Sequence, residues 1–148
     1  MYHSIIIEES LKNPQVLKNY KILRTKFESK ETPSDVDWHL HIVEIFDPER
    51  AIKEIQNVML SDKPYYFHIY DEGKKLIVIF KNKIFNLDPN NKKGWEEARA
   101  YGAERLNIPM EQLDFYPSRI SEEEGWFYRY GSLFNIIISK IKGIIKAI

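Results

Sequence analysis

Three of the four histidines lie in two short segments whose residue alternation is typical of β-strands. His39 and His41 are two positions apart in segment 38–46, and His68 lies in segment 65–70. Successive side chains of a strand point to opposite faces, so His39 and His41 are expected to share one face. Neutral imidazoles at this spacing can bind zinc or a similar ion, and a single imidazole can act as a general acid or base.

Two tyrosines accompany the third histidine. The alternation in 65–70 places Tyr66, His68 and Tyr70 on one side of the strand and apolar residues on the other. The apolar residues expected to pack beneath the helices are Leu40, Ile42, Phe67 and Ile69. The opposite, open face would then carry all the rings together. We therefore predict a ligand-binding or partner-binding surface made of His39, His41, Tyr66, His68 and Tyr70.

A metal site at His39, His41 and His68 is the alternative interpretation. It has no obvious carboxylate ligand, because Glu44 is predicted on the opposite face of its strand. No cofactor is predicted. The G-x-S-x-G, Walker, Rossmann and H-E-x-x-H patterns are all missing from the sequence, which gives no support to serine hydrolases, common nucleotide-binding folds or zincins. The sequence favours a small binding or interaction module over an enzyme.

Composition narrows the class of protein further. The 148 residues suit one compact core, and 22 basic residues balance 22 acidic ones, so no long-range field favours nucleic acid. Segment 75–80 is aliphatic where an RNA-binding sheet of the RRM type needs aromatic residues. There is no cysteine, which excludes disulfides and thiol catalysis. Together with a first segment unlike a signal peptide, this predicts a cytoplasmic protein.

Between Trp38 and Tyr116 the hydrophobic period alternates between that of strands and that of helices. Two helix starts carry a capping residue followed by proline, Asn13-Pro14 and Asp47-Pro48. The elements expected in this part of the chain are strands at 38–46, 65–70, 75–80, 84–87 and 113–116, and helices at about 49–59 and 95–106. This order predicts an α+β fold of the ferredoxin-like type, an antiparallel sheet with both helices on one face.

Further elements are expected at both ends of this core. Residues 5–7 are read as a strand or a buried entry segment, 14–19 as one or two helical turns, and 21–29 as a strand antiparallel to the next. We divide the chain into a sheet domain, 1–117, and an arm, 118–148, that packs on the same domain or on a partner.

The arm ends in an amphipathic helix, Leu133–Ile148, with isoleucines on one side and lysines on the other. Its lysines and its length exclude a transmembrane span. The apolar side can cover the sheet, pair with a second copy of the chain, or lie on a membrane surface. Packing within the protein or in a dimer is favoured, because the neutral chain gives little attraction to lipid. The predicted partner is therefore a second copy of the chain or another protein.

Four stretches carry a family resemblance: Ile6–Lys12, Trp38-His39, Val78–Phe85 and Leu113–Pro117. In these stretches the chain resembles a group of short prokaryotic proteins of unknown function. The resemblance covers about residues 5–117 and includes no catalytic motif. It implies no activity, and the arm from Ile120 onward lies outside it.

Overall fold

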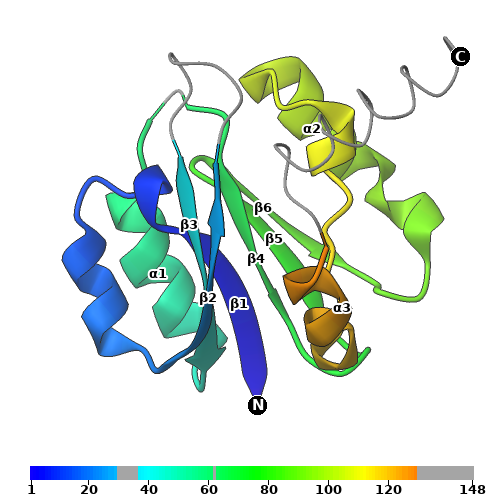
Figure 1. The fold of residues 1–148 in the computed structure, drawn as a ribbon. Helices are drawn as coiled ribbons and strands as arrows, with labels where there is room; N and C mark the ends of the chain where they lie inside the picture. The colour runs from blue at the N-terminus through cyan, green and yellow to red at the C-terminus, as the bar shows by residue number, and fades with distance from the viewer. Residues whose placement is uncertain (30–36, 62, 130–148) are drawn as a thin grey trace, which may run out of the picture.

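The computed structural model describes residues 1–29, 37–61 and 63–129. These residues contain one six-stranded sheet of order β2-β3-β1-β4-β5-β6, in which every neighbouring pair is antiparallel (Figure 1). The strands are β1 (Tyr2–Ile7), β2 (Ile22–Glu28), β3 (Trp38–Ile45), β4 (Tyr66–Tyr70), β5 (Leu76–Phe80) and β6 (Lys83–Leu87). The α+β class is confirmed, as are the β2–β3 pairing and the meander β4-β5-β6.

Helices connect and follow the strands. The α-helices within the described residues are α1 (Pro48–Val58), α2 (Glu96–Leu106) and α3 (Glu123–Phe127). The 3₁₀ helices in the same part of the chain are η1 (Glu8–Ser10), η2 (Pro14–Asn19), η3 (Lys92–Trp95), η4 (Met110–Gln112) and η5 (Ile120–Glu122). No helix of the described ranges combines the length and the apolar character that a membrane crossing requires. The predicted helix Leu133–Ile148 lies outside the described residues.

Local sequence explains where the first helices begin. The Asp47 side chain accepts a hydrogen bond from the backbone N–H of Arg50 at 3.3 Å, and Pro48 opens α1. In the same way the Asn13 side chain accepts from Gln15 N at 3.0 Å at the start of η2. Both predicted helix starts are confirmed, although the second is a 3₁₀ helix. At the C-terminal end of α2, Asn107 adopts the left-handed conformation (φ 56°) that ends many helices.

The sheet has a hydrophobic core on each face. The α1 face, covered by η1, η2 and α1, buries Ile6, Leu11, Leu17, Val43, Ile45, Ala51, Ile55, Met59, Phe67, Ile69, Ile77 and Ile79. The α2 face, covered by α2, α3 and the chain between them, buries Ile5, Leu40, Ile42, Tyr70, Leu76, Val78, Phe80, Phe85, Trp95, Ala98, Ile108, Leu113, Phe115 and Trp126. Figure 1 shows α1 on one side of the sheet and α2 and α3 on the other.

This arrangement corrects two expectations. The two predicted helices do not share a face of the sheet: Ile55 of α1 packs in one core and Ala98 of α2 in the other. The reason is visible in β5, which is buried at all five positions, since a strand that is apolar throughout needs cover on both faces. In addition, 113–116 is not a strand, because it pairs with none of the described strands. The ferredoxin-like arrangement is therefore not confirmed.

Helix α3 packs against the sheet. Trp126 of α3 is only 5% exposed and belongs to the core of the α2 face. Glu123 contacts His3 of β1, with 2.7 Å between its Oε2 and Nδ1 of the histidine. The described part of the predicted arm, up to residue 129, thus shares a core with the sheet, while the proposed boundary at 117 stays a prediction.

Candidate metal centre

The five predicted site residues do not form one surface. Strand β1 lies between β3 and β4, and Ile5 is opposite both Ile42 and His68. Because cross-strand partners point to the same face, His68 lies on the α2 face with Ile42. His41 is opposite Ile6 and lies on the α1 face. The prediction of a shared face was wrong because it assumed that β3 and β4 were neighbours with matching apolar sides.

On the α2 face, Tyr66, His68 and Tyr70 hold the chain that covers them. Tyr66 donates its hydroxyl to the carbonyl of Gln112 at 2.5 Å, and His68 Nε2 lies 2.7 Å from the carbonyl oxygen of Pro117. Tyr70 donates to Glu123 Oε2 at 2.5 Å.

The same burial shifts the pKa values of these groups. Burial raises the pKa of both tyrosines and lowers the pKa of His68 to about 4. At neutral pH all three rings are uncharged hydrogen-bonding groups inside the protein, under α3 and the chain that precedes it.

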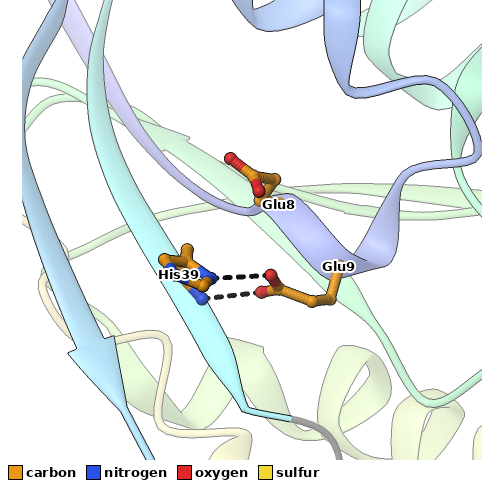
Figure 2. A group of neighbouring side chains, drawn as sticks. All are labelled: Glu8, Glu9 and His39. Atoms are coloured by element: carbon orange, nitrogen blue, oxygen red, sulfur yellow. Dashed lines mark hydrogen bonds and ion pairs between the residues drawn. The ribbon is translucent and has the colours of Figure 1, made fainter.

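On the α1 face, His39 lies beside two carboxylates that the sequence did not point to. Figure 2 shows Glu8 and Glu9 on the turn η1 and His39 on β3, with Glu9 reaching toward the histidine. Glu9 accepts twice from His39, at 2.6 Å from the backbone N–H and 2.8 Å from Nδ1. The hydrogen bond with Glu9 raises the pKa of His39, while desolvation acts in the opposite direction.

The turn η1 determines which side chains reach His39. Ser10 Oγ donates to the carbonyl of Ile7 at 2.6 Å, and Leu11 is buried with 6% of its surface exposed. Because Ser10 and Leu11 turn inward, the two preceding residues, Glu8 and Glu9, project over the start of β3. Antiparallel pairing of β1 with β3 brings this turn next to the start of β3.

His41 orients the second carboxylate. Its Nε2 lies 3.0 Å from Glu8 Oε1, and its Nδ1 lies 2.8 Å from the hydroxyl of Thr25 on β2. With one ring nitrogen donating to Glu8, the other can accept from Thr25. This is the kind of support that a metal-binding carboxylate needs, since its orientation depends on the groups hydrogen-bonded to it.

The ligand atoms of Glu8, Glu9 and His39 lie within 4.8 Å of one another. Ligand atoms about 2.1 Å from a tetrahedral ion are about 3.4 Å apart, so the widest separations in the group must shorten by up to about 1.4 Å to bind one. The side chains have room to move, since those of Glu8 and His39 are 40% and 45% exposed. Within residues 1–29, 37–61 and 63–129 this is the only group of three or more such ligands at this spacing.

Glu8 and Glu9 were not among the predicted site residues, because they lie on η1, outside the two strands that carry the predicted rings. A signal was present: three isoleucines followed immediately by Glu8 and Glu9. A continuous apolar run of this kind favours a strand in the centre of a sheet, so acids directly after it are expected beside one end of a neighbouring strand. The pairing that identifies this neighbour as β3 is not visible in the sequence.

An open cavity borders the cluster. It has a volume of about 450 Å³, and its lining residues are Glu8, Pro14, Gln15, Leu17, Lys18, Tyr20 and Ile22. Glu8 therefore belongs both to the carboxylate–histidine cluster and to the wall of a cavity large enough for a small molecule. Comparison of the chain with protein-family models, with curated proteins and with solved structures gives no match.

Proposed function

We propose that this protein binds a divalent transition-metal ion through Glu8, Glu9 and His39. The observation that carries the proposal is the convergence of one imidazole and two carboxylates, whose ligand atoms lie within 4.8 Å. Nitrogen and carboxylate oxygen ligands without thiolate suit Zn²⁺, and also Mn²⁺ or Fe²⁺. His68, a candidate in the sequence, is not included, because it lies on the α2 face.

The proposed centre is open rather than closed. Three protein ligands leave at least one coordination position for water or an added ligand, as in catalytic zinc sites. The cavity is lined by Glu8 but not by Glu9 or His39, so a small molecule in it would approach the ion from the Glu8 side. We therefore propose a metal site that presents its ion to a ligand. A reducing compartment suits a chain without cysteine, so the cytoplasmic location stays part of the proposal.

Zinc titration of the full, tag-free chain by isothermal calorimetry tests the proposal, with elemental analysis of the protein as purified. We expect one ion per chain, and a loss of affinity of at least about tenfold in His39→Gln and Glu9→Gln, the lower end of the effect of losing a ligand's support. Glu8→Gln is expected to behave in the same way. Thermal unfolding of each apo variant shows whether it is folded.

The chain offers a matched control in His3. Its Nδ1 lies 2.7 Å from Glu123 Oε2, so this pair has the same chemistry as His39 and Glu9. The described residues place no third metal ligand beside it. His3→Gln is therefore expected to bind zinc like the wild type. Equal affinities of wild type and His39→Gln, or no zinc binding by the wild type, contradict the proposal.

A second candidate function is self-association through strand β2. This strand lies at one edge of the sheet and pairs, among the described strands, only with β3. It exposes Ile22, Leu23 and Phe27, with Phe27 56% exposed. An edge strand is a template for pairing with another chain, and here the three exposed apolar side chains share β2 with Arg24, Lys26 and Glu28. The helix predicted to form a dimer, Leu133–Ile148, lies outside the described residues and adds nothing to this argument.

Analytical ultracentrifugation over a range of protein concentrations tests the self-association. We expect a dimer that dissociates in Phe27→Lys, because a lysine on an edge strand opposes strand pairing. Phe46→Lys is the control, since Phe46 is 77% exposed and lies outside β2. A wild-type monomer at every concentration, or equal dissociation in both variants, contradicts it.

A further inference from the structure

A second cavity lies on the α2 side of the molecule and shares no residue with the candidate metal centre. Its volume is about 360 Å³. The residues that line it are Pro89, Lys92, Trp95, Asp114, Tyr116, Ser118, Arg119, Glu122 and Arg129. It thus lies between the chain before α2, the segment 114–119 and the chain around α3. A volume of this size falls at the lower end of small-molecule sites, which span about 300–1,000 Å³.

The charges that line this cavity are unequal. Both carboxylates are engaged: Asp114 pairs with Arg129 at 2.9 Å, and Glu122 accepts from the backbone N–H and the hydroxyl of Ser118 at 2.9 and 3.1 Å. Lys92 and Arg119 form no ion pair with any described residue. The lining thus carries three cationic side chains, Lys92, Arg119 and Arg129, against the two carboxylates, although Arg119 also attracts the exposed carboxylate of Glu72.

Arg119 is held in place before any ligand binds. Its Nη2 donates to Oδ1 of Asn90, and Nδ2 of Asn90 donates in turn to the carbonyl of Gly73 at 3.0 Å. The guanidinium also lies directly against Gly73, where an added Cβ would collide with Nη1. Positioning of this kind lowers the conformational entropy that a binding group loses when its ligand arrives.

The segment that forms one wall has an unusual backbone. Phe115 has a positive φ of 50°, although it is an aromatic residue, and its ring is fully buried. This conformation costs about 1–2 kcal/mol, and such strain occurs mainly at ligand sites and switch regions. Asp114 fixes the bend by accepting from Tyr116 N at 3.2 Å. The bend places Asp114, Tyr116 and Ser118 on the wall of the cavity.

We propose that this cavity binds a small organic anion whose phosphate or carboxylate group pairs with Lys92 and Arg119. Arginine recognises such groups through its planar fork of donors, and lysine adds a point charge. Lys92 lies over the ring of Trp95, with its Nζ 5.6 Å from the centroid, so its ammonium is also placed by a contact. The cavity, its excess of cationic over acidic side chains and a fixed guanidinium all point to this class of ligand.

Amide chemical shifts in ¹⁵N-labelled full-length protein test the proposal. The probes are glycerol 3-phosphate, succinate and, as the uncharged control, glycerol. We expect saturable shifts of the Ser118 and Arg119 amides with one or both anions and none with glycerol. A response to the phosphate ester alone, or to the dicarboxylate alone, identifies which anionic group the cavity accepts.

Three variants decide whether Lys92 and Arg119 hold the anion. Lys92→Gln and Arg119→Gln are expected to weaken binding at least about tenfold, the effect of losing one hydrogen bond to a charged group. Lys53→Gln removes an exposed lysine from α1 and is expected to bind like the wild type. Lys92 is exposed, so its variant keeps the test decisive even if Arg119→Gln fails to fold. No saturable shift with either anion, or equal affinities of Lys92→Gln and Lys53→Gln, overturns the proposal.

Discussion

His68 makes the stability of this protein depend on pH in a definite direction. Its side chain is 4% exposed, and burial lowers its pKa from the ordinary value to about 4, even though the Pro117 carbonyl and the charge of Asp114 favour protonation. In the unfolded chain the same imidazole titrates near the ordinary value of about 6.5. Between these two values the unfolded state binds a proton that the folded state does not.

This difference in proton binding determines the direction and the size of the change in the free energy of unfolding with pH. As the pH falls from about 6.5 to about 4, protonation of the unfolded state lowers the free energy of unfolding, by about 3 kcal/mol in the limit. Between about pH 7 and about pH 5 the loss is about 2 kcal/mol. The contribution of His68 to the free energy of unfolding is fully present at pH values above the pKa of this imidazole in the unfolded chain. His39 acts in the opposite direction, because its pKa is raised in the folded state, so its contribution is lost as the pH rises.

Urea unfolding at a series of pH values measures this dependence, and a variant isolates His68. His68→Gln keeps a donor for the Pro117 carbonyl but cannot titrate, so its free energy of unfolding is expected to fall about 2 kcal/mol less than that of the wild type from about pH 7 to about pH 5. His39→Gln is the control, and its loss over the same interval is expected to be larger than that of the wild type. Imidazole C–H shifts report the His68 pKa directly.

If the free energy of unfolding falls equally in the wild type and in His68→Gln between about pH 7 and about pH 5, the reasoning is refuted. Equal losses mean that His68 has the same pKa in the folded and unfolded states. An imidazole resonance of His68 that titrates near its ordinary pKa refutes it independently. Glu54 and Glu72 do not confuse this result, since their pKa values are lowered from already acidic ones and they titrate below the interval.

Three substitutions test other parts of the structure by thermal and urea unfolding. Asp47→Ala removes the side chain that caps α1 and is expected to cost about 1 kcal/mol, whereas Asp47→Asn keeps the acceptor and costs much less; equal costs contradict the capping role. Gly73→Ala is expected to cost more than about 1 kcal/mol, because its φ is 100° and a Cβ meets Arg119; an unchanged stability contradicts that contact. Tyr70→Phe removes the hydroxyl that donates to Glu123, with an expected cost of about 2 kcal/mol, and a neutral effect contradicts the importance of that bond for α3.

Most elements could be predicted from the sequence because their signals are local. The capping side chains of Asn13 and Asp47 with their following prolines correctly place the starts of η2 and α1. Residues 113–116 show the limit of such signals. Leu113 and Phe115 are both fully buried, as alternation implies, yet the chain there bends with a positive φ instead of pairing. Alternating hydrophobicity reports burial, and burial does not require a neighbouring strand.

The candidate site depended on information that is not local. Each strand has two possible phases relative to its neighbours, and a wrong neighbour reverses the face of every side chain. Placing β1 between β3 and β4 puts His41 and His68 on opposite faces, each with different partners. The same insertion brings Glu8 and Glu9 to His39. The position of β1, which was not predicted, therefore separates the predicted site residues and also brings Glu8 and Glu9 next to His39.

The two faces give the histidines different chemistry, and this is why only one of them suits an ion. His68 is enclosed with a carbonyl oxygen as its hydrogen-bond partner, so burial keeps it neutral although the charge of Asp114 acts in the opposite direction. His39 is 45% exposed and already bonded to a carboxylate, so a metal can reach it and replace its proton. The choice between a structural and a ligand-binding histidine thus follows from solvent access and from the charge of its neighbours, both of which are determined by strand order.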